Sequence, residues 1–157
     1  MSYTVDANLL VFASDEASDL HVPARAFVDR MAGGPEIAYL FWPTALAYLR
    51  ISTHPAIFSR PLSARQAVAN LQAILDLPHV RTAGEQDRFW ARFLEVADDV
   101  EPTGNLVPDA HLVALMIENG VTVIWTHDRD FRKFGGITAR DPFEGGRARR
   151  PARLRKR

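Results

Sequence analysis

The chain has 157 residues, which suits one domain with one substantial core and is too short for two ordinary domains. Hydrophobic residues make up 47% of it, so it can bury a core, and the absence of cysteine excludes a disulfide scaffold, a cysteine nucleophile and a thiolate zinc site. The net charge is zero, yet all 19 acidic residues lie at or before Glu144 and 7 of the 19 basic residues follow it, so the body carries 12 − 19 = −7 and the tail +7. A basic tail fits a polyanion or an acidic protein surface as partner, or else a disordered solubilising end or a cloning or reading-frame extension.

The first half of the chain predicts strands alternating with helices. A short strand is expected at Ser2–Val5, a helix opening near Asn8–Phe12, and a helix at His21–Met31 that Gly33, Gly34 and Pro35 end. The apolar run Ile37–Phe41 has the length of a strand, and Pro43 begins a helix that extends to about Ile51. The N-terminal segment has an acidic residue in its apolar run and no cationic lead, so we expect neither a signal peptide nor a membrane span, which fits a cytoplasmic protein.

The second half continues the alternation. A helix is expected at Ser63–Leu75 with Ser63 as its N-cap, a short strand at Val80–Thr82 and an amphipathic helix at Gln86–Ala97. A helix at Pro108–Asn119 should stop at Gly120, before the β-branched strand Val121–Trp125 and a last strand at Ile137–Ala139. Strands alternating with helices predict an α/β domain with a parallel sheet covered on both faces, whose strand order cannot be read from the sequence.

Acidic residues recur at one kind of position in this pattern. Asp6 ends the first strand, Asp109 lies in the first turn of a helix, and Asp128 and Asp130 follow the Val121–Trp125 strand. Because strand C-termini and helix N-termini gather at one edge of a parallel sheet, these carboxylates are expected to converge there. Converging carboxylates repel, and hard oxygen ligands suit Mg²⁺ or Mn²⁺, so the pattern favours a divalent metal site that also attracts phosphate.

Simpler explanations exist for each residue taken alone. Asp6 could be a helix N-cap, Asp109 could complement a helix dipole, and Asp128 and Asp130 could be turn residues, so only their joint placement favours a site. A phospho-acceptor of a receiver domain is the other α/β alternative, but Asp15 and Glu16 lie far from Asp6 and Lys133 is poorly placed for it. Four basic residues are candidates for holding RNA phosphates, with solvated surface charge as the alternative: Arg50, Arg129, Arg132 and Lys133.

Three segments carry a resemblance to a known family. VDANLLVF at 5–12 looks like the opening of PIN-domain toxins, WPTALAYLRISTHPAIFSRPLS at 42–63 resembles a segment of actinobacterial VapC proteins, and the segment 104–137, with its THDRDF motif, resembles their catalytic half. The chain is thus similar to PIN-domain ribonucleases of the VapC type, the toxins of bacterial toxin–antitoxin pairs.

That resemblance implies a three-layer α/β/α domain over residues 1–143, with a mostly parallel sheet of about five strands, followed by a basic, disordered tail over 144–157. It implies Mg²⁺-dependent cleavage of structured tRNA or rRNA, Mn²⁺ being a possible substitute, a VapB-like antitoxin and a homodimer. Its motif positions make Asp6, Asp109 and Asp128 the catalytic, metal-ligating acids and Asp130 an accessory ligand. Thr126 matches a conserved hydroxyl beside them, and Asn105 a family asparagine near the site.

One position departs from the family pattern. The usual glutamate before the aromatic–Leu–Arg of the third helix is replaced by Ala47, which cannot ligate a metal. Three explanations stay open: the four aspartates suffice, the alanine was introduced to make a toxic protein tolerable, or the chain is a natural nuclease of weakened or lost activity. The alternative function is accordingly an inactive PIN-like module that binds RNA or antitoxin. Residual activity is expected, since three ligands and water can still hold Mg²⁺.

Overall fold

The computed structural model describes residues 1–144, and the predicted basic tail lies outside these residues except for Glu144. Five parallel strands form one sheet in the order β3-β2-β1-β4-β5, with β1 (Ser2–Val5) in the centre. The other strands are β2 (Ile37–Phe41), β3 (Val80–Ala83), β4 (Val123–Trp125) and β5 (Thr138–Arg140). The predicted three-layer α/β fold is confirmed, and the sheet is parallel throughout.

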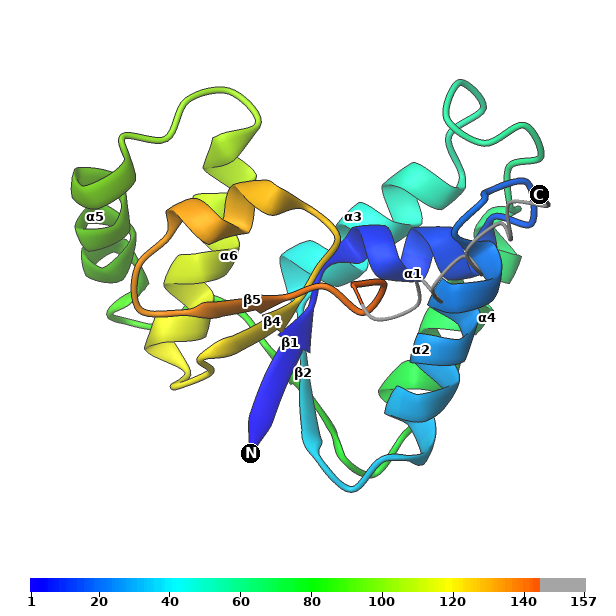
Figure 1. Cartoon of the computed structure of the whole chain (residues 1–157), viewed down its shortest axis with the longest axis horizontal. Coiled ribbons are helices and arrows are strands. Elements are labelled where there is room, and N and C mark those ends of the chain that lie inside the picture. The colour runs from blue at the N-terminus through cyan, green and yellow to red at the C-terminus, as the bar shows by residue number, and fades with distance from the viewer. Residues whose placement is uncertain (145–157) are drawn as a thin grey trace, which may run out of the picture.

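Helices cover both faces of this sheet (Figure 1). One face carries α1 (Ala7–Ser14), α2 (His21–Gly33), α3 (Trp42–Ser52) and α4 (Ala64–Leu75), and the other carries α5 (Phe89–Val100), α6 (Leu106–Glu118) and the 3-10 helix η1 (Arg129–Lys133). Alternate side chains of β1 and its neighbours enter two separate cores: Tyr3 and Val5 pack with α1–α4, while Phe41 and Ile124 pack with α5 and α6.

Local signals set most helix ends where the sequence predicts them. Ser63 accepts a hydrogen bond from the Gln66 amide at 3.2 Å while the Gln66 side chain accepts one from the Ser63 amide at 2.9 Å, which closes a capping box on α4. Gly120 ends α6 with a φ of +67°, in the left-handed region that only glycine adopts at little cost.

Two of the boundaries that differ from the prediction are explained by hydrogen bonds that the sequence pattern does not show. Helix α5 begins at Phe89 rather than Gln86, because the backbone amides of Gln86 and Arg88 donate to the Glu118 carboxylate, both at 3.1 Å, and are held in a loop. Strand β4 begins at Val123 because the Val121 amide bonds to the Met116 carbonyl at 2.9 Å and so completes the end of α6. The 3-10 helix η1 was not predicted.

The topology brings the polar residues that follow β1 and β4 to the same edge of the sheet. From β1 the chain adds β2 and β3 on one side, then returns to add β4 and β5 on the other, so β1 and β4 meet where the direction of strand addition reverses. In open parallel sheets ligands bind outside the strands at such a reversal. Asp6 follows β1 directly and Thr126 follows β4 directly, which places them at this point.

Candidate metal centre

Three carboxylates converge at this edge of the sheet. Asp109, Asp128 and Asp130 each offer an oxygen that lies within 4.8 Å of the other two, and all three side chains are half-buried. Asp109 comes from the first turn of α6, Asp128 is the N-cap of η1 and Asp130 lies in the first turn of η1. Two helix N-termini therefore face the same carboxylates, which favours negative charge at that point.

Asp6 lies beside these three residues but is not one of the mutually close group. It is the N-cap of α1, is only 9% exposed, and accepts from the Asn8 amide at 3.4 Å and the Asn8 side chain at 3.2 Å. The simple N-cap explanation for Asp6 is therefore correct, and it coexists with the site, because the second carboxylate oxygen faces Thr126. Asn8 was not predicted as part of the site, although an asparagine two residues after an N-cap aspartate was a usable signal.

Thr126 links Asp6 to the acidic loop. Its hydroxyl is buried, donates to Asp6 Oδ2 at 3.0 Å and accepts from the Asp128 amide at 2.9 Å. The Asp128 carboxylate in turn accepts from the Asp130 amide at 2.8 Å. A continuous chain of hydrogen bonds thus runs from the end of β1 to the start of η1 and orients the carboxylates of Asp6 and Asp128.

The electrostatics of the group are those of a cation site. Burial, with the charges of Asp128, Asp6 and Asp130, raises the pKa of Asp109 to about 7. Burial also raises the pKa of Asp6, although the hydrogen bonds from Thr126 and Asn8 oppose the shift. Without a counter-charge, at least one carboxyl group keeps its proton near neutral pH. Hard oxygen donors at this spacing fit a divalent cation such as Mg²⁺ or Mn²⁺, which would remove that repulsion.

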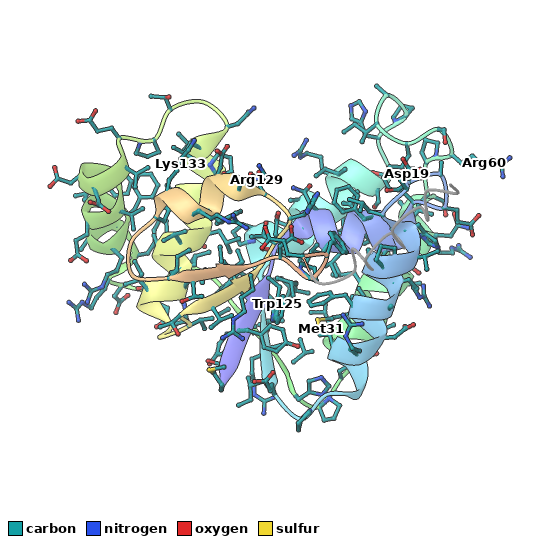
Figure 2. The ribbon with its side chains drawn as sticks, viewed as in Figure 1. Asp19, Met31, Arg60, Trp125, Arg129 and Lys133 are labelled. Carbon is teal, nitrogen blue, oxygen red and sulfur yellow. The ribbon has the colours of Figure 1, made fainter. Side chains whose placement is uncertain are left out.

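The other predicted residues lie at different distances from the acids. Lys133 Nζ pairs with Asp130 Oδ1 at 2.7 Å, Arg132 pairs with Glu144, and Arg129 is exposed. Figure 2 shows Arg129 and Lys133 above η1, whereas Arg60 projects from the far end of the molecule.

Three further positions singled out from the sequence lie on α3 and at the start of α6. Arg50 lies on the last turn of α3, in a shallow hollow shared with α4 that none of the four aspartates lines. Asn105 is the exposed N-cap residue of α6, and its side chain makes no capping bond. Ala47 is half-buried in α3 and has no ligating atom.

A protein-family model for the PIN domain matches residues 3–137. The chain belongs to the PIN-domain family. This PIN domain is 52% identical over 145 residues to a protein named ribonuclease VapC48 from Mycobacterium tuberculosis, a match that covers 92% of the chain and all of the relative. It is 31% identical to ribonuclease VapC43 of the same organism, over 90% of the chain and 95% of that relative.

Solved structures agree with the fold of this PIN domain. It superimposes with a TM-score of 0.63 on VapBC2 from Rickettsia felis, bound to a DNA fragment from its promoter, at 15% identity over 90% of this chain and 98% of that one. It superimposes with a TM-score of 0.61 on M. tuberculosis VapC20, a toxin that cleaves the sarcin–ricin loop, at 17% identity over 83% of this chain and 92% of that one. At these identities the likeness concerns the fold. The described residues contain no helix long and apolar enough to cross a membrane.

Proposed function

We propose that this PIN domain is a divalent-metal-dependent endoribonuclease and the toxin of a VapBC-type toxin–antitoxin pair. The observation that carries the proposal is the convergence of Asp109, Asp128 and Asp130 within 4.8 Å, next to buried Asp6. The names of relatives 52% and 31% identical to this chain support the ribonuclease activity. The proposed metal is Mg²⁺, with Mn²⁺ as a substitute, and the proposed substrate is structured RNA such as tRNA or rRNA, which is found in the cytoplasm.

Different residues of the chain would bind the metal and the RNA in this reaction. Asp109, Asp128 and Asp130 would hold the cation, with Asp6 beside them and its direction fixed by Thr126. Activation of a water molecule and neutralisation of charge on the scissile phosphate are the chemistry that a divalent cation supplies when bound. Arg129, at the start of η1 between two of the acids, is available to hold RNA phosphates, and so is the exposed side-chain amide of Asn105 at the start of α6.

Two more basic residues of η1 already have acidic partners. Lys133 pairs with Asp130, and Arg132 pairs with Glu144 at an exposed position. Exposed ion pairs of this kind contribute little to stability, so both cations can exchange the carboxylate for a phosphate when RNA binds. Arg50, on the last turn of α3, would contact only a more distant part of the substrate.

Two protein partners belong to the proposal. A VapB-like antitoxin is supported by the solved VapBC neighbour, and a second copy of this chain is supported by large apolar side chains left exposed on α3. Trp42 is 45% and Leu46 62% exposed, one turn apart on the same helix face. Sedimentation of the full chain should therefore give a dimer that Leu46→Asp converts to a monomer.

Purified protein incubated with total tRNA and Mg²⁺ or Mn²⁺ tests the activity. We expect cleavage by the wild-type chain, its loss in Asp6→Asn and Asp109→Asn, and its retention in Asp19→Asn, an exposed acid at the far end of the molecule (Figure 2). Circular dichroism of each variant controls for folding. Unchanged cleavage in both site variants would reject the site, and RNA binding without any product would reject the nuclease in favour of a binding module.

A further inference from the structure

The loop that carries Thr126 and Asp128 is hydrogen-bonded to the end of β5 and to the segment that follows it. The Thr126 amide donates to the Arg140 carbonyl at 2.9 Å, next to the point where the loop leaves β4. One residue further along both segments, His127 Nδ1 lies 2.8 Å from Asp141 Oδ2. Because a carboxylate only accepts, the imidazole N–H donates in this bond. Arg132 and Glu144 pair at the other end of η1, so the same short segment spans the whole acidic loop.

His127 occupies the side of the loop opposite to the acids. Its ring sits edge-on between Phe12 and Phe143, with ring centres 6.4 Å and 5.1 Å away, and both phenylalanines pack on the core formed with α1–α4. Thr126 and Asp128 lie on either side of His127 in the sequence and direct their polar groups toward Asp6 and η1. Because the bond from the Asp128 amide to the Thr126 hydroxyl closes a turn with His127 at its centre, holding the His127 side chain in place also holds its two neighbours.

Two hydrogen bonds fix the carboxylate of Asp141 beside His127. Its carboxyl side chain is only 10% exposed, and each of its oxygens has its own donor: Oδ2 faces His127, and Oδ1 accepts from the Phe143 amide at 2.9 Å. The second bond forms a turn that keeps the carboxylate in place. A nearly buried carboxylate costs stability unless its donors are present, so this arrangement favours a single position of the loop.

We propose that Asp141 is a positioning residue for the metal centre: acting through His127, it holds the Thr126–Asp128 loop so that the Asp128 carboxylate faces Asp109. The inference rests on the metal centre of the proposed function but requires no RNA chemistry. Groups that orient metal ligands without touching the metal typically change metal affinity by about 10–100-fold when they are removed.

Three variants separate this role from a simple contribution to folding. Asp141→Ala removes both acceptor oxygens, the one that faces His127 and the one that holds the Phe143 amide. His127→Ala removes only the other partner of the contact, and the double variant Asp141→Ala/His127→Ala tests whether one acts through the other. Asp15→Ala is the matched control, because Asp15 Oδ1 accepts from the amide two residues on, at 3.1 Å, in the same kind of turn without a histidine.

The assay is the affinity of the full chain for Mn²⁺ alone, followed by electron paramagnetic resonance, together with hydrogen exchange of the Asp128 amide in metal-free protein. We expect Asp141→Ala and His127→Ala each to weaken Mn²⁺ binding by about tenfold and to accelerate that exchange. The double variant should bind no more weakly than either single variant, and Asp15→Ala should match the wild type in both measurements.

Wild-type affinity for Mn²⁺ in Asp141→Ala, or effects of Asp141→Ala and His127→Ala that add in the double variant, would overturn the inference. So would a wild-type chain that binds no Mn²⁺. Because neither readout contains RNA, a wild-type chain that binds Mn²⁺ and cleaves no RNA would refute the proposed function while leaving the role of Asp141 to be decided by the affinities.

Discussion

The Thr126 hydroxyl joins Asp6 to the acidic loop, so Thr126→Val is an informative substitution for the architecture of the site. Valine keeps the shape of threonine and removes its hydrogen bonds, at a position only 2% exposed. The Asp6 carboxyl group loses its donor at 3.0 Å, and the Asp128 amide loses its acceptor at 2.9 Å. A hydrogen bond to a charged group contributes about 1.5–3 kcal/mol, and an amide left without a partner costs about 1–3 kcal/mol.

Some of this cost is recovered because the added methyl group is apolar and the loop can relax, so we expect the free energy of unfolding to fall by about 2–4 kcal/mol. For a chain of this length that corresponds to a Tm about 5–15 °C lower. Urea unfolding in EDTA at pH 8, followed by circular dichroism, measures the change without any metal contribution. Thr126→Ser keeps the hydroxyl, loses one buried methyl group and should cost only about 1 kcal/mol. A valine variant as stable as the serine variant would refute the hydrogen-bond chain.

Four other outcomes are expected. The folded-state pKa of Asp109, about 7, lies above its unfolded value, so the metal-free folded protein binds more protons than the unfolded chain between about pH 4 and 7. Its free energy of unfolding should therefore fall as pH rises through that window. In urea titrations at several pH values, Asp109→Asn should make this dependence on pH weaker. Mg²⁺ must displace the same proton, so its apparent dissociation constant should rise by about tenfold per pH unit below 7, as calorimetry would detect. Ala47→Glu should raise the rate of tRNA cleavage if this position is a lost ligand, and an unchanged rate would show that the aspartates suffice. Ser63→Ala should lower stability by about 1 kcal/mol in urea unfolding, through loss of the capping box, and leave cleavage unchanged.

The sequence was sufficient to predict the bounds of helices and strands where the signal is local. Apolar runs located β1 and β2 to the residue, Ser63 marked the start of α4, and Gly120 marked the end of α6. The meeting of Asp109 with Asp128 and Asp130 could also be predicted, because parallel strands bring their carboxyl ends to one edge of the sheet.

The rest depends on contacts between distant segments, which periodicity does not encode. The carboxylate of Glu118 shortens α5 from another helix, and the hydroxyl of Thr126 reaches Asp6 across 120 positions of sequence. The pairing of His127 with Asp141 could not be read either, because the sequence does not specify which way a single histidine turns its ring.

The central position of β1 has a consequence for synthesis of the chain on the ribosome. The first strand to emerge can pair with β2 early, but its other edge stays open until β4 leaves the exit tunnel, and an open edge invites pairing with other chains. Asp6 and Asp109 are made before β4, whereas Asp128 and Asp130 follow it. A nascent or truncated chain that ends before β4 therefore contains only two of the four aspartates, so the chemistry of the centre can begin only once β4 and η1 have been translated.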